Sequence, residues 1–394
     1  MCWDNQQESG RRFRLTVCGD LAPCGPSGRM LAAQRNTDLW GGIATEFTGS
    51  DFAIANLECP LTTVRGDSEK RGPALRVAPE CAYSIRAAGL HAVSVANNHI
   101  MDMGAQGLAD TLKACEQAGL ATVGAGMDLN AAMRPIILER DGLRVAILAI
   151  AEREFSIAED NQPGAAPVDP ITNSEQISLA RQQADVVVVL LHGGNEYYPL
   201  PRPGLVKLCR FLIRCGAAAV VCHHTHVPGP VERFEGGVIC YGLGNFLFDG
   251  IVPRNEDWYV GYLIHLDLTR EGVADFKIVP FRQAHNPTKL YRLKGEEERA
   301  FFERLRRLGE ILGSPELLLE QWRQFCESRK SRYLIPLRAP VELRGLARLC
   351  SRFPGLLTLL VPKRARLFTL NVLRCDSHRE AVETILAGMG RQQK

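Results

Sequence analysis

Apolar runs of strand length alternate with amphipathic segments of helix length along most of the chain. This alternation is typical of a parallel or mixed β-sheet whose strands are joined by helices. The expected strands cover residues 13–18, 52–56, 91–95, 186–191, 217–221, 238–241, 259–268 and 275–279. The expected helices cover residues 79–88, 104–118 and 203–215. The pattern therefore predicts an α/β fold, in which polar residues at the strand ends gather at one edge of a sheet.

Turn residues between the apolar runs add two expectations. The runs at residues 136–138 and 145–150 are joined through Asp141-Gly142, a pair that favours a tight hairpin. The Gly/Pro-rich stretch at residues 162–170 is expected to form a surface loop. A second possibility for this stretch is a lid over the site. Beyond residue 290 the pattern becomes helical.

Charge divides the chain near residue 286. Residues 1–286 carry 25 Lys and Arg against 32 Asp and Glu, a net charge of −7, whereas residues 287–394 carry 22 against 12, a net charge of +10. A chain of 394 residues is also longer than one hydrophobic core usually fills. We therefore expect a catalytic domain over residues 1–286 and a basic, mostly helical appendage over residues 287–394.

Composition narrows the class of protein. The content of hydrophobic residues, 46%, and of charged residues, 23%, is typical of an ordinary folded chain. Thirteen cysteines without a CxxC pair suggest reduced, mostly buried thiols. The N-terminus is polar and no apolar stretch is long enough to span a bilayer, so we expect no signal peptide, no transmembrane segment and a cytoplasmic location. Nucleic acid is not expected as a partner.

The basic tail has two interpretations. In the first, residues 344–366 make peripheral contact with an anionic membrane surface or polymer. The basic residues around the apolar run at 356–361 are Arg344, Arg348, Arg352, Lys363, Arg364 and Arg366. In the second, which we favour, the segment belongs to a helical appendage with solvated arginines, because its charges form no uninterrupted block.

Histidines gather at the ends of the apolar runs. Five of the nine follow three expected strands: His99, His192, His223, His224 and His226. Asp20, Glu58 and Asn98 stand at the ends of such runs as well. Imidazole, carboxylate and amide groups bind zinc, manganese or iron, and metal-assisted hydrolysis needs such a set. The sequence therefore predicts a centre for one or two divalent ions (Mn, Zn or Fe).

Short motifs follow one another in a characteristic order. They are Gly19-Asp20, ANLECPLT at 55–62, ANNH at 96–99, VGAG at 123–126, LHGGNEY at 191–197, HTHV at 224–227 and YGLGNF at 241–246. In these motifs the chain resembles the bacterial capsule-synthesis family of the CapA type, linked to poly-γ-glutamate, over residues 15–249. That family is similar in fold to calcineurin-like metallophosphoesterases. The resemblance implies a β-sandwich flanked by helices (αββα), with the ligands on loops after the strands.

The resemblance also implies a ligand set. Glu58 would bridge two ions. The remaining ligands would be Asn98, His192 and His224 on one ion and Asp20 and His226 on the other. Two positions depart from the pattern. Thr225 and Cys222 stand where the family often has Pro and Gly, which alters the loop but keeps both histidine ligands. Asp20 is followed by Leu21-Ala22 where phosphoesterases usually have a histidine. The first ion would therefore lack one imidazole.

Further polar residues are candidates for contact with substrate. The resemblance implies that His99 would lie beside the leaving group as a general acid or charge stabiliser. The other candidates are Arg29, Asn97, Glu196, His223 and Asn245. Glu196 would orient a ligand histidine or contact substrate, and His223 would neighbour the ligands. Arg29 would reach an anionic group through its planar guanidinium, with a solvated loop arginine as the alternative. For Asn97 and Asn245 the alternative is a simple turn cap.

Two functional hypotheses follow. The first is a metal-dependent hydrolase, in which a metal-bound hydroxide attacks a phosphoester or a γ-glutamyl-type amide of an anionic small molecule or polymer. The second is a non-catalytic accessory protein of anionic-polymer synthesis that keeps the site for binding, and the missing histidine after Asp20 favours it. A hydrolase with a serine nucleophile is disfavoured because the chain has no G-x-S-x-G motif.

Overall fold

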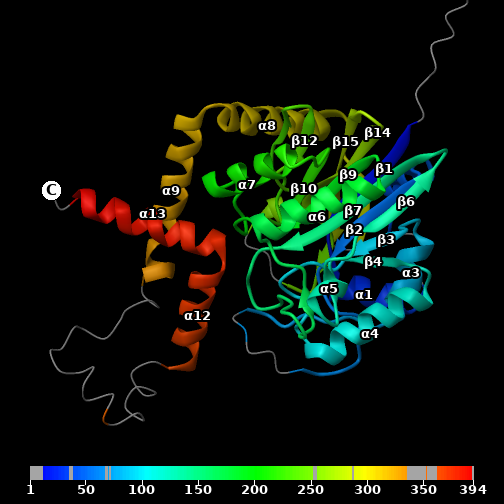
Figure 1. Cartoon of the computed structure of the whole chain (residues 1–394), viewed down its shortest axis with the longest axis horizontal. Helices are drawn as coiled ribbons and strands as arrows, with labels where there is room; N and C mark the ends of the chain where they lie inside the picture. Colours follow the sequence, from blue (N-terminus) through cyan, green and yellow to red (C-terminus); the bar gives the residue numbers. More distant parts are fainter. Residues whose placement is uncertain are drawn as a thin grey trace, which may run out of the picture.

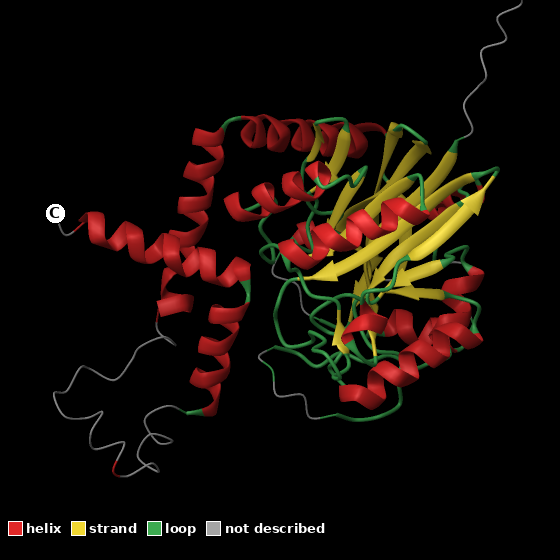
Figure 2. Cartoon of the chain, viewed as in Figure 1, coloured by secondary structure: helices red, strands yellow, loops and turns green. Residues whose placement is uncertain are grey.

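The computed structural model describes residues 12–34, 39–66, 70, 72–251, 255–285, 288–334, 352 and 362–392. These residues form two large β-sheets with helices on their outer sides and a third, two-stranded sheet, followed by a helical C-terminal region (Figures 1 and 2). The structure therefore confirms the expected α/β fold, with two sheets, flanking helices and a helical C-terminal region.

The first sheet is mixed. Its strand order is β16-β15-β14-β1-β2-β3-β4, and β13 also pairs with β1. The strands are β1 (Phe13–Pro23), β2 (Phe52–Leu57), β3 (Ala92–Ser94), β4 (Ala121–Val123), β13 (Asn245–Asp249), β14 (Val260–Thr269), β15 (Gly272–His285) and β16 (Thr288–Arg292). Strands β1 to β4 run parallel, as does β13 beside β1, whereas β14 to β16 join in antiparallel pairs.

The second sheet has the order β11-β12-β10-β9-β7-β6. Its strands are β6 (Ile136–Arg140), β7 (Leu143–Ala151), β9 (Val186–His192), β10 (Ala219–His223), β11 (Val231–Phe234) and β12 (Gly237–Cys240). The expected hairpin between β6 and β7 is confirmed. Both of its turn residues have positive φ, 52° at Asp141 and 77° at Gly142, as a tight hairpin turn requires.

The continuous apolar run of β9 is explained by burial on both faces. Val186, Val188 and Leu190 lie in the core that also contains residues of the first sheet. Their neighbours Val187 and Val189 belong to a second cluster, shared with the helices on the outer side. Successive side chains of a strand point to opposite faces, so a strand between two apolar layers is apolar throughout.

Helices cover the outer sides of the two sheets. On the second sheet, α6 (Pro170–Gln183) packs against β7 and β9, and α7 (Pro203–Arg214) packs against β10 and β12. The other helices of this part are α1 (Pro26–Ala32), α2 (Thr45–Thr48), α3 (Cys81–Ala87), α4 (Gly104–Gln117) and α5 (Leu129–Ala132), with short 3-10 turns at Gly41–Ile43 and Glu256–Tyr259.

The described part of the C-terminal region contains α8 (Gly295–Gly313), α9 (Pro315–Leu334), α12 (Lys363–Arg374) and α13 (Asp376–Gln392) (Figure 1). Trp322 of α9 is buried, and its Nε1 donates to Thr384 Oγ1 of α13 at 2.9 Å. Most of the basic segment 344–366 lies outside the described residues. Among the helices that are described, none combines the length and apolar character needed to cross a bilayer.

The expectation of a surface loop at residues 162–170 is wrong. Residues 164–168 are buried, and β8 (Gly164–Ala165) pairs with β5 (Ala125–Gly126) in a small antiparallel ladder. Small side chains make this possible, because a Cβ on Gly164 would stand 2.5 Å from the backbone nitrogen of Ala158. The same Gly and Ala residues that are common in exposed loops here permit close packing.

Candidate metal centre

The register of the strands brings the predicted site residues to one edge of each sheet. In the first sheet Asp20 on β1 pairs with Asn56 on β2 and with Asn245 on β13. In the second sheet His192 at the end of β9 pairs with His223 at the end of β10. Parallel strands end at the same edge, so the residues that follow them converge.

One close contact joins the two sheets at these edges, and a second joins β1 to the residue before β13 within the first sheet. His223 Nε2 lies 3.0 Å from the carbonyl oxygen of Cys18, across the gap between the sheets. The backbone amide of Asp20 donates to the carbonyl oxygen of Gly244 at 3.1 Å. A Cβ on Gly19 would stand 1.9 Å from that same oxygen, so only glycine permits this approach.

Glu58, which directly follows β2, is fully buried between the sheets. Neither of its carboxylate oxygens has a hydrogen-bond partner among the described residues. Its Oε1 lies 3.5 Å from His192 Nε2 and 3.8 Å from His226 Nε2. Burial, with a smaller contribution from the negative charge of Asp20, raises the pKa of Glu58 well above its ordinary value. A carboxylate in this position is costly unless it is protonated or lies beside a cation.

Among the described residues, three groups of side chains have donor atoms within 4.8 Å of one another, close enough to share an ion. One group, away from Glu58, is Glu154, Cys375 and His378. The two groups at the expected centre are Asp20, Glu58 and His192, and Glu58, His224 and His226. Glu58 belongs to both. Carboxylate oxygens and imidazole nitrogens are donors that zinc, manganese and iron accept, so the residues present fit the expected divalent ions.

Asn98 and His224 both approach the same ring nitrogen of His192. His192 Nε2 lies 3.0 Å from Asn98 Oδ1 and 3.0 Å from His224 Nδ1. The amide nitrogen of Asn98 donates to Glu154 Oε2 at 2.8 Å, which turns its oxygen toward His192. Burial and the neighbouring histidines, His224 foremost, lower the pKa of His192 well below its ordinary value. The ring is therefore neutral, which is the form that binds metal.

Asp20 and His226 form the other side of the centre. Asp20 accepts hydrogen bonds from Asn56 Nδ2 at 2.8 Å and from the backbone amide of His224 at 3.1 Å, and its Oδ2 lies 3.4 Å from His226 Nδ1. Burial alone would raise the pKa of Asp20, but the hydrogen bond and charge of His226 outweigh burial and lower it. His226 Nδ1 also lies 2.9 Å from Asn245 Oδ1.

The loop that carries His224 and His226 is strained. Their φ angles are +85° and +60°, a region that residues other than glycine seldom adopt. Each such residue costs about 1 to 3 kcal/mol, and residues of this kind gather at functional sites. In this conformation one short loop places a ring nitrogen of both histidines within 4.8 Å of a Glu58 carboxylate oxygen.

His99 is held by a charged pair. Its Nδ1 lies 2.7 Å from Asp102 Oδ2 and 2.8 Å from Lys70 Nζ, and Lys70 is ion-paired with Asp102. Burial and the charge of Lys70 lower the pKa of His99. Asn97 fixes the loop, because its Oδ1 accepts from the His99 amide at 3.1 Å and its Nδ2 donates to the carbonyl oxygen of Leu57 at 2.8 Å.

Arg29 is the one predicted site residue that the structure places away from this group. Its side chain is exposed on α1, because Ser27, Gly28 and Leu31 form the buried side of that helix. Arg29 does not line the cavity beside the centre. The interpretation of Arg29 as a solvated arginine therefore fits the structure better than a contact with substrate.

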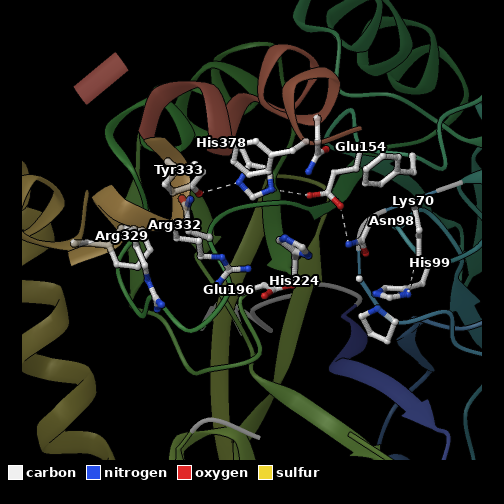
Figure 3. A pocket seen from close by; sticks show the side chains of 17 residues that line it. Lys70, Asn98, His99, Glu154, Glu196, His224, Arg329, Arg332, Tyr333 and His378 are labelled. Carbon is white, nitrogen blue, oxygen red and sulfur yellow. Dashed lines mark hydrogen bonds and ion pairs between the residues drawn. The ribbon is translucent and has the colours of Figure 1, made fainter. Parts of the chain in front are cut away.

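A cavity of about 320 Å³ opens beside the centre (Figure 3). Lining residues from the two-sheet part include Lys70, Asn98, His99, Glu154, Glu196 and His224. The C-terminal helices contribute Phe325, Arg329, Arg332, Tyr333, Phe368, Asn371 and His378. Sequence reasoning missed several of these residues. Glu154 follows the end of β7 as other site residues follow their strands, and Asp102 stands three residues after His99, but the C-terminal residues follow no strand and carry no such signal.

Comparison with known proteins identifies the family. Residues 14–250 match the model of the bacterial capsule synthesis protein PGA_cap. The chain is 34% identical over 239 residues to the PGA biosynthesis protein CapA of Bacillus subtilis (strain 168), covering 59% of this chain and 62% of that protein. It is 30% identical over 285 residues to the capsule biosynthesis protein CapA of Bacillus anthracis, covering 70% and 68%.

A third relative comes from Mycobacterium tuberculosis (strain CDC 1551 / Oshkosh). It is named a probable polyglutamine synthesis accessory protein, MT0602, and is 31% identical over 266 residues, covering 62% of this chain and 69% of that protein. The matches thus span 62 to 69% of the lengths of these three relatives. Since the family match covers more than half of the sequence, the chain belongs to the PGA_cap family of bacterial capsule synthesis proteins.

Proposed function

We propose that this protein is a metal-dependent hydrolase of capsule or poly-γ-glutamate synthesis, acting on a phosphoester or a γ-glutamyl-type amide of an anionic substrate. The observation that carries the proposal is Glu58, a fully buried carboxylate without a hydrogen-bond partner among the described residues. Nitrogen atoms of His192 and His226 lie within 4 Å of it. A buried carboxylate without a hydrogen-bond partner is stable when a divalent cation lies beside it.

The proposed ligands divide into two sets around Glu58. They are Asn98, His192 and His224 on one side and Asp20 and His226 on the other. A divalent ion held there would supply Lewis acidity and would lower the pKa of a bound water. The buried aromatic side chain of Trp258, whose ring centroid lies 4.7 Å from that of His226, keeps this side of the centre away from solvent.

His99 is the proposed proton donor to the leaving group. It lines the cavity, and its Nδ1 is engaged by Asp102 and Lys70, which leaves Nε2 as the ring nitrogen that can serve the substrate. Asp102 would stabilise the protonated ring between transfers. Asn97 would keep the ring in place through its hydrogen bond to the His99 backbone.

The direct test combines metal analysis with turnover. We expect the purified protein to bind manganese or zinc and to hydrolyse bis(p-nitrophenyl) phosphate or γ-glutamyl p-nitroanilide. His192→Ala and Asn98→Ala should lower both the metal content and kcat/KM, the latter by about 100-fold or more. His91→Ala is the matched control, because His91 precedes β3 at the opposite end of the sheet and stacks on Phe52. A protein that binds no divalent metal under any of these conditions would refute the proposal.

A binding role without turnover is the second candidate. It is favoured by Asp20, which is followed by the buried apolar residues Leu21 and Ala22 in place of a histidine ligand. The name of the mycobacterial relative, an accessory protein, is consistent with this role. The metal-loaded protein would then bind poly-γ-glutamate without cleaving it, and His192→Ala would weaken binding while no product formed with either protein.

A further inference from the structure

We infer that Glu154, Cys375 and His378 form a separate metal site, which binds one zinc ion and joins the C-terminal helices to the two-sheet part of the molecule. This site shares no ligand with the proposed centre around Glu58. Two of its three residues lie outside residues 14–250, which the family match covers. The inference does not depend on the proposed hydrolase activity.

The three side chains come from two segments that are far apart in the sequence. Glu154 lies in the loop after β7, which ends at Ala151. Cys375 is the residue between α12 and α13, and His378 belongs to the first turn of α13. Cys375 and His378 are three positions apart, a spacing that brings two side chains to the same side of a helical turn. Glu154 therefore meets a pair of donors whose spacing is set by the start of α13.

The distances between the donor atoms fit a tetrahedral zinc ion. Glu154 Oε1 lies 3.3 Å from His378 Nε2 and 3.8 Å from Cys375 Sγ, and the three donors lie within 4.8 Å of one another. Zinc bonds of about 2.0 Å to nitrogen and oxygen and about 2.3 Å to sulfur, at tetrahedral angles, separate nitrogen from oxygen by about 3.3 Å and sulfur from oxygen by about 3.5 Å. One ion can therefore contact all three donors with little movement of the side chains.

Further contacts orient two of these donors. Tyr333 OH lies 2.9 Å from His378 Nδ1, so Nε2 is the ring nitrogen that faces Glu154. Glu154 Oε2 accepts from Asn98 Nδ2 at 2.8 Å, which leaves Oε1 toward Cys375 and His378. Figure 3 shows the contacts of His378 with Tyr333 and Glu154. Contacts of this kind fix the direction of metal ligands. An ion on Glu154 Oε1 would thus also fix the carboxylate that orients Asn98.

The donor set favours zinc. Thiolate sulfur is a soft donor that selects zinc over manganese, magnesium and calcium, and zinc also accepts imidazole and carboxylate. Cys375 is fully buried, whereas Glu154 and His378 line the cavity, which gives the ion a path from solvent. The thiol proton of Cys375 leaves to solvent when the ion binds. Three protein ligands leave the fourth tetrahedral position to a water molecule.

A separate ion pair holds α13 against the two-sheet part. Arg202, which is buried, donates to Glu152 directly after β7 and to Glu380 of α13, each at 2.5 Å. The segment that contains Cys375 and His378 is therefore held beside the loop after β7 by contacts that need no metal. A metal site requires such a rigid support for its ligands.

Cobalt substitution tests this site, because cobalt(II) bound to a thiolate has a sulfur-to-metal charge-transfer band in the near ultraviolet. The proposed centre contains only oxygen and nitrogen donors and gives no such band. Cobalt(II) is titrated into the metal-free full chain, and zinc is then added to displace it. We expect the band in the wild type and its loss in Cys375→Ser, and His378→Gln should bind cobalt about tenfold or more weakly at this site. The matched control is Cys326→Ser, a buried cysteine of α9 outside the group, which should keep the band.

A measurement on the wild type keeps the test independent of how well the variants fold. X-ray absorption at the zinc edge should detect a sulfur neighbour of zinc at about 2.3 Å. Absence of that neighbour, absence of the cobalt band in the wild type, or a band that persists unchanged in Cys375→Ser would each overturn the inference. Equal unfolding midpoints of the metal-free proteins show that the variants are folded.

The outcomes also separate this inference from the proposed function. His192→Ala should keep the cobalt band, because it alters only the centre around Glu58, and loss of the band in His192→Ala would overturn the inference. A band in a protein that hydrolyses no substrate would support the zinc site and remove the hydrolase. Turnover by a protein without the band would leave the hydrolase intact and remove the zinc site.

Discussion

Among the proposed metal ligands, Glu58 is the one whose ionised form depends most on a bound cation. Because burial raises its pKa, the folded protein holds the Glu58 proton more tightly than the unfolded chain does. The stability that this proton contributes is present below the ordinary pKa of glutamate and is lost as the pH rises toward the folded-state pKa. In metal-free protein at neutral pH, Glu58→Gln should therefore be more stable than the wild type, by about 1 kcal/mol or more.

Urea unfolding in a chelating buffer, between about pH 4.5 and pH 8, measures this difference. The advantage of Glu58→Gln should shrink as the pH falls, because the wild-type carboxyl then becomes neutral as well. An advantage that grows toward acid pH would contradict the assignment of Glu58 as a buried group without a partner.

Added metal should reverse the order of the two proteins. An ion that binds only the folded state stabilises it by an amount that grows with its concentration. Excess manganese should raise the unfolding midpoint of the wild type and leave that of Glu58→Gln nearly unchanged. The control is His265→Gln, because His265 is hydrogen-bonded to Thr16 and Glu46 outside the centre. The response of this variant to metal should equal that of the wild type. Equal stabilisation of all three proteins would show that the ion binds elsewhere.

At the scale of single residues, the sequence indicated which side chains follow strand ends but not their partners. Glu58 and His192 could be selected because each ends an apolar run. Lys70 could not, since it lies in a polar stretch with no periodic pattern and reaches His99 through tertiary contact alone. For Arg29 the sequence left two interpretations open, because an arginine after Pro26, Ser27 and Gly28 has the same local sequence whether it faces a site or solvent.

At the scale of elements, the junction of β1 and β13 depends on Gly19. A Cβ at this position would meet the carbonyl oxygen of Gly244 at 1.9 Å, and that oxygen belongs to backbone that cannot rotate away. Gly19→Ala should lower the free energy of unfolding by about 1 to 3 kcal/mol and should weaken metal binding through the displaced Asp20. Gly49→Ala is the control, because a Cβ there meets nothing within 4 Å and φ is negative. Denaturant unfolding measures the free energy of unfolding of both variants. Equal values for Gly19→Ala and Gly49→Ala would contradict the close approach of β1 and β13.

Element types followed from periodicity where the pattern was strong. Strands such as β9 and the hairpin of β6 and β7 were predictable, because apolar runs and the Asp141-Gly142 turn have few alternatives. The stretch at residues 162–170 was not, since glycine and alanine suit an exposed loop and a tightly packed ladder equally. Its burial depends on the packing of β8 against β5, which is set by the fold and not by the local sequence.

At the scale of the whole molecule, Arg202 joins the two-sheet part to the C-terminal helices. Removing its guanidinium leaves Glu152 buried without its cation, because both of these side chains have almost no solvent exposure. Arg202→Ala should therefore lower the free energy of unfolding by about 3 to 5 kcal/mol. Arg214→Ala, which removes the exposed pair with Glu235, should change stability little. Denaturant unfolding compares the two, and similar small losses would indicate that α13 is not anchored in this way.

The contribution of the C-terminal helices to the cavity was beyond sequence reasoning. No pattern in the sequence links His378 to the expected metal ligands, yet it contacts Glu154 and lines the cavity. No local pattern links a helix near the C-terminus to a strand end more than two hundred residues earlier. The boundary at residue 286 remains a prediction.

Diffraction from crystals grown with manganese or zinc, recorded at the absorption edge of the metal, tests the central claim most directly. We predict anomalous peaks within coordination distance of Glu58, with Asn98, His192 and His224 around one of them and Asp20 and His226 beside the other if two ions bind. Peaks only at other positions, or no peak beside Glu58 in crystals soaked with excess metal, would contradict the account.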